Sequence, residues 1–178
     1  MDGVDRYRRA LRSFGELVRA VPADGWARPS PCPGWSAADV VEHVAGAQRT
    51  LLSLLGADPG RDGPSGPRER WLDVEARVLA ALDDPSVAGR RHATPLGEVS
   101  GVELADMSVV EPLVHRWDLA RAVGADDAVD EELAAGCLAI ARRFAAVLRG
   151  PGMYGPELAA PADASAGPAL LAYLGRRP

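Results

Sequence analysis

Apolar side chains recur every three or four residues along much of the chain, with polar side chains between them. This spacing is typical of amphipathic helices, because residues three and four apart share one helix face. It predicts helices over residues 5–21, 36–55, 69–82, 104–123, 130–148 and 169–174. The alternating pattern of a half-buried strand is almost absent. We therefore expect an all-α protein.

Local signals support these helices. Ser36 followed by Asp39 is an acidic variant of the capping box, and Gly124 is a typical residue to end the helix that precedes it. The first helix has an apolar stripe of Tyr7, Leu11, Phe14, Leu17 and Val18, and the helix over 69–82 has one of Leu72, Ala76, Leu79 and Leu82. Segments rich in Gly, Pro and Asp separate the helices.

Four to five helices of this length predict an up-and-down bundle. The irregular stretch 84–101 is long enough to cross from one end of a bundle to the other. We expect a four-helix bundle with this long crossover connection and a short C-terminal extension, forming a single domain over residues 1–178.

Composition removes several classes of function. The net charge is −5, which leaves no basic footprint for a nucleic acid. No apolar run approaches the roughly 20 residues of a membrane span, and the polar N-terminus does not resemble a secretory signal, so we expect a cytoplasmic protein. All 20 basic residues are Arg, which excludes a Schiff-base lysine and the usual P-loop, and the bias indicates a GC-rich genome such as an actinomycete's. The oligomeric state stays open.

The most informative chemistry lies in two of the three histidines. Glu111 and His115 are four residues apart, so on a helix their side chains project from one face and can share a metal ion. His43, beside the apolar stripe of an earlier helix, would supply a third ligand. Two imidazoles and a carboxylate suit Zn²⁺ with one position left open, and Ni²⁺ or Fe²⁺ are alternatives. The competing interpretation is a surface Glu–His pair and a flanking histidine that bonds a neighbour.

Other residues have two interpretations each. Asp118 either orients the His115 imidazole or pairs with Arg121 on the helix surface. Cys32, between two prolines, is either a structural turn residue, which we favour, or faces a cleft. Cys137 is expected to be buried filler.

The remaining aromatic and histidine residues are interpreted structurally. Trp35 and Trp117 are favoured as core anchors over substrate platforms. His92, in a predicted loop, is expected to be solvated and to reach the site only if that loop folds inward.

Two segments together resemble a known family. Trp26, the run Pro29-Ser30-Pro31-Cys32-Pro33-Gly34-Trp35-Ser36 and Val41-Glu42-His43-Val44 resemble the opening of the mycothiol-dependent maleylpyruvate isomerase N-terminal domain, within the DinB-like superfamily. Glu111 to His115, followed by Trp117-Asp118-Leu119-Ala120-Arg121-Ala122, is similar to that family's second metal motif. The C-terminal segment is similar to a single-domain actinobacterial branch of metal-binding proteins.

The resemblance implies a DinB-like bundle that binds a divalent metal through His43, Glu111 and His115. Relatives use the metal to activate a thiol such as mycothiol, which implies a mycothiol-dependent S-transferase or isomerase acting on an electrophilic small molecule. The alternative is a non-catalytic metal-binding or regulatory module.

Three features depart from the family pattern. The sequence stops at Pro178, so we expect it to resemble the metal domain without the isomerase's additional domain. Arg116 replaces a small residue. Pro112 directly follows Glu111, and inside a helix it is expected to cost about 3 kcal/mol and to kink the axis.

Overall fold

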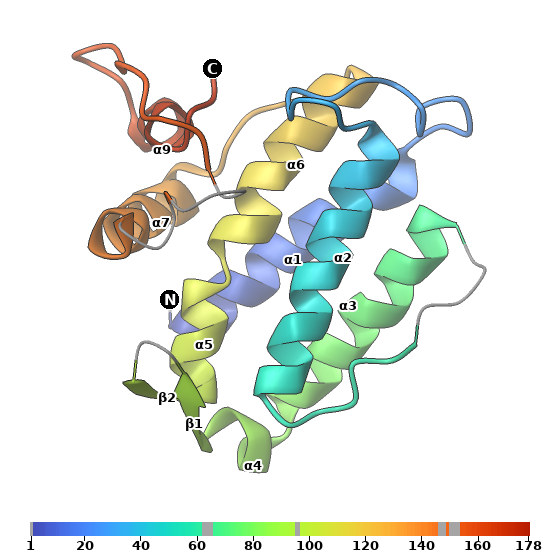
Figure 1. Cartoon of the computed structure of the whole chain (residues 1–178), viewed down its shortest axis with the longest axis vertical. Coiled ribbons are helices and arrows are strands. Elements are labelled where there is room, and N and C mark those ends of the chain that lie inside the picture. The colour runs from blue at the N-terminus through green and yellow to red at the C-terminus, as the bar shows by residue number, and fades with distance from the viewer. Residues whose placement is uncertain (1, 62–65, 95–96, 146–148, 150–153) are drawn as a thin grey trace. The chain divides into compact units, whose positions relative to one another are not determined.

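The computed structural model describes residues 2–61, 66–94, 97–145, 149 and 154–178 (Figure 1). Helices make up most of this part of the chain, which confirms the all-α prediction. The chain divides into two compact units, Met1–Asp126 and Asp127–Pro178. The single domain expected over 1–178 stays a prediction.

The first unit contains the bundle and the second a helical pair. The bundle helices are α1 (Gly3–Ala20), α2 (Ala37–Leu54), α3 (Pro67–Asp83), α5 (Gly101–Met107) and α6 (Val110–Val123). In the second unit α7 (Glu131–Arg143) packs against α9 (Ala166–Tyr173). The α7 helix ends at Arg143, and the end predicted for it at residue 148 falls outside the described part of the chain. Within the described part, no helix has the length and apolarity needed to cross a membrane.

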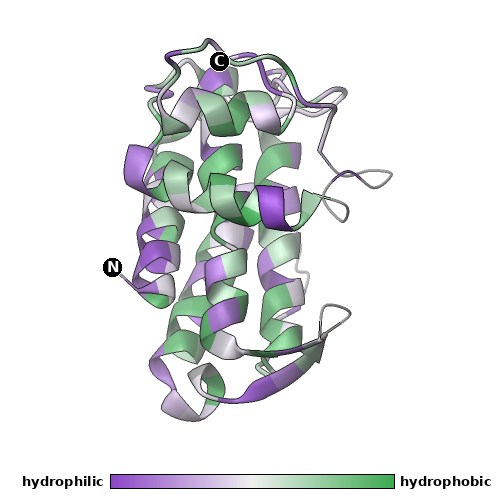
Figure 2. Cartoon of the chain, turned by 90° about the vertical axis from the view of Figure 1, so that its left-hand side faces the viewer, coloured by the Kyte–Doolittle hydropathy of each residue, from purple (hydrophilic) through white to green (hydrophobic). Residues whose placement is uncertain are grey.

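The bundle core is formed by the inner faces of α1, α2, α3 and α6. Hydrophobic and hydrophilic residues lie side by side along single helices in Figure 2. The stripe predicted on α1 is fully buried, and Phe14 meets Trp71 edge-on with ring centroids 4.6 Å apart. The stripe predicted on α3 is wrong except for Leu82. The buried face instead carries Trp71, Val74 and Val78, because the large indole covers more apolar area than the leucine beside it.

The long connection lies elsewhere than predicted. An ion pair joins Arg70 near the start of α3 to Glu42 near the start of α2, so the two helices run in the same direction. The chain must therefore return along the bundle between Leu54 and Pro67. The stretch 84–101 stays at the end of the bundle where α3 ends (Figure 1).

That stretch is also more ordered than predicted. It contains α4 (Pro85–Ala88) and an antiparallel hairpin of β1 (Arg91–Thr94) and β2 (Gly97–Ser100). His92 pairs with Val99 in this hairpin and is 8% exposed, so the solvated loop position expected for it is wrong. Only four residues form each strand, which is too few for a convincing alternation in the sequence.

The helix predicted over 104–123 is interrupted, and Pro112 explains why. In a continuous helix its ring would clash with the carbonyl of the residue four positions earlier, Ser108. The chain breaks there, at Ser108 and Val109, and α6 begins at Val110. Pro112 thus lies in the first turn, where a backbone N–H has no partner within the helix. The mid-helix cost predicted for it is not incurred, and Glu111 also falls in the first turn.

Candidate metal centre

His43, Glu111 and His115 lie together in the first unit. The Nε2 atom of His43 is 3.1 Å from Oε2 of Glu111, and the Nε2 atom of His115 is 3.5 Å from the same oxygen. One ligand atom from each of the three residues lies within 4.8 Å of the others. The imidazole centroids are also 4.8 Å apart. The surface-pair interpretation of Glu111 and His115 is wrong, because the His115 side chain is only 5% exposed.

These distances fit one small cation. Two ligands bound to Zn²⁺ in tetrahedral geometry, each about 2.0–2.1 Å from the ion, are separated by about 3.3 Å. The two separations from Glu111 lie on either side of that value. The donors are two imidazole nitrogens, which bind a metal ion when the ring is neutral, and one carboxylate oxygen. In tetrahedral geometry this set leaves a fourth position for another ligand.

Two features of the fold bring the donors together. Ser36 and Asp39 form the predicted capping box, with the Ser36 N–H 2.8 Å from Asp39 Oδ2, which fixes the start of α2 about two turns before His43. The four-residue spacing on α6 places Glu111 and His115 on one face. The α2 and α6 helices pack against each other, so the facing side chains meet.

The centre is open on the side of His43. The exposed fraction of the side chain is 41% for His43, 24% for Glu111 and 5% for His115. An open ligand position there is reachable from solvent, while His115 is held in the protein interior. Small molecules therefore reach the three donors from the His43 side, whereas the buried His115 imidazole is fixed in position.

A tight turn before α2 brings two more residues to the centre. The Trp35 N–H donates to the Cys32 carbonyl at 3.0 Å, with Pro33 and Gly34 between them. Gly34 has φ of 78°, which a type II turn requires at this position and which glycine adopts without strain. The turn directs Cys32 and Trp35 to the imidazoles.

Trp35 lines the centre instead of the core. Its ring centroid is 4.8 Å from that of His43 and 6.1 Å from that of His115. The core-anchor interpretation is therefore wrong for Trp35 and confirmed for Trp117, which is 5% exposed. Trp35 differs from Trp117 because it follows a tight turn, and the spacing of apolar residues in helices does not predict the geometry of that turn.

Asp118 lies on the other side of His115. It is fully buried, and its Oδ2 is 2.9 Å from the Nδ1 atom of His115. The surface alternative for Asp118 is wrong. Burial lowers the pKa of His115, but contacts with Asp118, Cys32 and Glu111 outweigh burial and raise that pKa well above its ordinary value. The pocket around His115 therefore favours positive charge.

The two cysteines differ. Cys32 is half-buried and contacts His115, so it faces the centre, which is the interpretation we did not favour. Cys137 is 1% exposed in α7, which confirms its expected burial.

Sequence reasoning overlooked a buried polar pair near the centre. The Tyr7 hydroxyl donates to Oε1 of Gln48, and both residues are at most 1% exposed. Burial, and next the negative charge of Glu111, raise the pKa of Tyr7. Tyr7 occupies an apolar stripe position, so the pattern indicates a core residue and gives no sign of its polar contact.

Comparisons with known proteins show which family the chain resembles. Residues 7–120 match the family described as the mycothiol maleylpyruvate isomerase N-terminal domain. An uncharacterized protein of Mycobacterium tuberculosis, found in two strains, is 32% identical over 182 residues, covering 99% of this chain and 98% of its own. A second uncharacterized protein of that organism is 28% identical over 135 residues, covering 61% of this chain and 51% of its own. No solved structure matches significantly.

Proposed function

Because the chain belongs to the mycothiol maleylpyruvate isomerase N-terminal domain family, we propose that it binds a divalent cation and activates a small thiol there. The cation is Zn²⁺, with Ni²⁺ or Fe²⁺ as alternatives, and its ligands are His43, Glu111 and His115. The thiol is mycothiol or a relative, and the reaction is S-transfer to, or isomerisation of, an electrophilic small molecule.

The convergence of three donor atoms is the observation that carries this proposal. The separations of 3.1 and 3.5 Å match those between ligands of one Zn²⁺ ion. The buried His115 imidazole and the partly buried Glu111 carboxylate are costly unless they are paired or metal-bound. The half-exposed His43 edge leaves a side from which a thiol can approach.

Residues of the chain would prepare the reaction as follows. A bound Zn²⁺ would lower the pKa of a coordinated thiol, so that the thiol reacts as a thiolate at neutral pH. Asp118, beside Nδ1 of His115, favours a proton on that nitrogen and leaves Nε2 free to bind. The Trp35 ring lies against both imidazoles.

Metal content tests the first half of the proposal. Purified wild-type protein is expected to hold about one ion per chain, and His43→Ala to hold very little. His92→Ala is the matched control, because His92 lies in the hairpin and is expected to leave the metal content unchanged. Equal, near-zero content in wild type and His43→Ala would refute the metal site.

Turnover tests the second half. Metal-loaded protein with mycothiol and a panel of electrophiles is expected to give thiol conjugates or thiol-dependent isomerisation, detected by mass spectrometry and lost in His43→Ala. Metal binding without any turnover would instead favour a non-catalytic metal-binding or regulatory module. The cytoplasmic location and the lack of a nucleic-acid partner stay predictions.

A further inference from the structure

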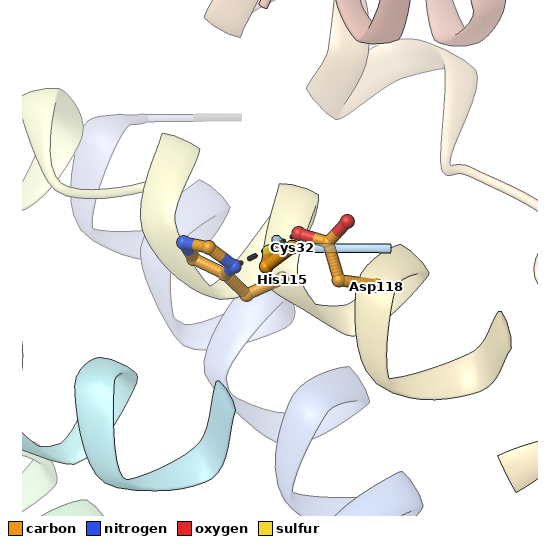
Figure 3. A group of neighbouring side chains, drawn as sticks. All are labelled: Cys32, His115 and Asp118. Carbon is orange, nitrogen blue, oxygen red and sulfur yellow. Dashed lines mark ion pairs between the residues drawn. The ribbon is translucent and has the colours of Figure 1, made fainter. Parts of the chain in front are cut away.

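The second ring nitrogen of His115 faces a different set of donors. Its Nε2 faces Glu111. Its Nδ1 faces Asp118 and Cys32 (Figure 3). One ligand atom from each of Cys32, His115 and Asp118 lies within 4.8 Å of the others. A single imidazole therefore separates two donor groups, only one of which contains sulfur.

This second group lies deeper than the first. Asp118 is fully buried and the His115 side chain is 5% exposed. Nδ1 is 2.9 Å from Oδ2 of Asp118, but the two atoms are not aligned as a hydrogen bond. Among the residues that the structure describes, this buried nitrogen has no hydrogen-bond partner. Buried polar atoms are rarely left in this state. A cation beside Nδ1 would satisfy it.

Cys32 is the most exposed residue of this group. It is half-buried. It lies in the loop before α2, where the turn through Pro33 and Gly34 holds it in place. A second hydrogen bond fixes the cysteine, from its own N–H to the Ser30 hydroxyl at 3.2 Å. The cysteine is therefore the member of the group nearest to solvent.

We propose that Cys32, Nδ1 of His115 and Asp118 form a second cation site, which takes thiophilic divalent cations such as Cd²⁺. Thiolate ligands favour soft cations, whereas two imidazoles and a carboxylate accept harder ones. On binding, a sulfur–metal bond replaces the S–H bond of Cys32, and the released proton passes to solvent. No oxidation or reduction takes place.

The two sites exclude each other. A neutral imidazole has one nitrogen with a free lone pair and one that carries a proton. When a cation binds Nδ1 of His115, the proton resides on Nε2 and that nitrogen no longer serves the His43–Glu111 site. Each chain therefore binds one cation at a time, and the softness of the cation decides which site it occupies. His115 is the one proposed ligand common to both sites, and Asp118 acts on the first site only through the imidazole, so either site can fail alone.

Cadmium titration tests the second site. Full-length protein in thiol-free buffer is titrated with Cd²⁺ while the ultraviolet charge-transfer absorption of a cadmium–thiolate bond is recorded. The wild type is expected to develop this band and to saturate at one equivalent. Cys32→Ser is expected to abolish the band. His43→Ala is expected to keep it, because His43 belongs to the other site.

Cys137→Ser is the matched control, since Cys137 is the other cysteine of the chain and lies buried in α7. It is expected to keep the full band. Absence of the band in the wild type, its persistence in Cys32→Ser, or its loss in His43→Ala would overturn the inference. Saturation at two cations per chain in a mixture of Cd²⁺ and Ni²⁺ would overturn the mutual exclusion. Cadmium NMR of the wild type reports a sulfur ligand directly, so the inference stays testable even if Cys32→Ser does not fold.

Discussion

Asp118 is buried beside Nδ1 of His115, while Nε2 of the same ring faces Glu111. The carboxylate can therefore orient the metal-binding imidazole, and this role can be measured. Residues that hold a metal-binding imidazole in place raise metal affinity by about 10–100-fold. Asp118→Asn keeps the volume and removes the charge beside Nδ1. We expect its Zn²⁺ affinity to fall by about 10–100-fold, measured by competition with a chromogenic chelator.

A surface aspartate provides the control for that measurement. Asp24 forms an exposed ion pair with Arg28 at 2.8 Å, and exposed pairs contribute little. Asp24→Asn is expected to bind Zn²⁺ as the wild type does. Unchanged affinity in Asp118→Asn would contradict an orienting role for Asp118.

Glu75 is a second buried carboxylate, and it links stability to pH. Burial raises its pKa above the ordinary 4.5, while the hydrogen bond and charge of Arg19 oppose that shift. A raised carboxyl pKa means that the folded state holds the proton more tightly than the unfolded state. The stability from this group is therefore present below pH 4.5 and is lost as the pH rises through the folded pKa.

Glu75→Gln should remove this pH dependence, because glutamine stays neutral. We expect the free energy of unfolding of the variant, relative to wild type, to increase from about pH 4 to about pH 7 in urea titrations. Glu69→Gln, at an exposed position of the same helix, is expected to give a flat difference. A difference for Glu75→Gln that falls with pH would mean that the Arg19 ion pair outweighs burial.

The sequence identified part of this site and missed the rest for a physical reason. The spacing of Glu111 and His115 is set by one helix, so it can be recognised without a fold. The positions of Cys32 and Trp35 depend on a turn, and the burial of Asp118 depends on packing around α6. Neither is encoded in a local period.

Among the secondary-structure elements, Pro112 tests whether α6 begins at Val110 or continues from the helix before it. A proline inside a helix costs about 3 kcal/mol, whereas in the first turn it costs little. Because α6 begins at Val110, Pro112→Ala is expected to stabilise the protein by well under about 3 kcal/mol in chemical denaturation. A gain near the full 3 kcal/mol would place the proline inside a strained continuous helix.

The other departures at this scale have a common cause. Helix periodicity correctly located α1, α2 and the end of α6. It missed the break before α6 and chose the wrong apolar face of α3, which presents two apolar lines one position apart. Trp71 decides between them through its contact with Phe14, a residue far away in sequence. The hairpin of β1 and β2 likewise depends on pairing between two very short segments.

For the whole molecule, the metal ligands have a consequence for stability. All three proposed ligands lie in the unit Met1–Asp126, on two helices far apart in sequence. A cation that binds only the folded state stabilises it by about 2.7 kcal/mol at a concentration 100 times its Kd. Amides of α1, α2 and α6 that exchange through global unfolding should therefore slow by about 100-fold in hydrogen exchange with Zn²⁺.

The same experiment tests the domain organisation predicted from the sequence. The unit Asp127–Pro178 has about 50 residues, and chains this small bury too little surface to be stable without help. If residues 1–178 form one domain, the most protected amides of α7 and α9 should slow with Zn²⁺ as much as those of the bundle, although no proposed ligand lies there. His43→Ala should abolish the slowing in both units. Slowing confined to the bundle would show instead that the two units unfold separately, because a cation protects only the segments that unfold together with its ligands.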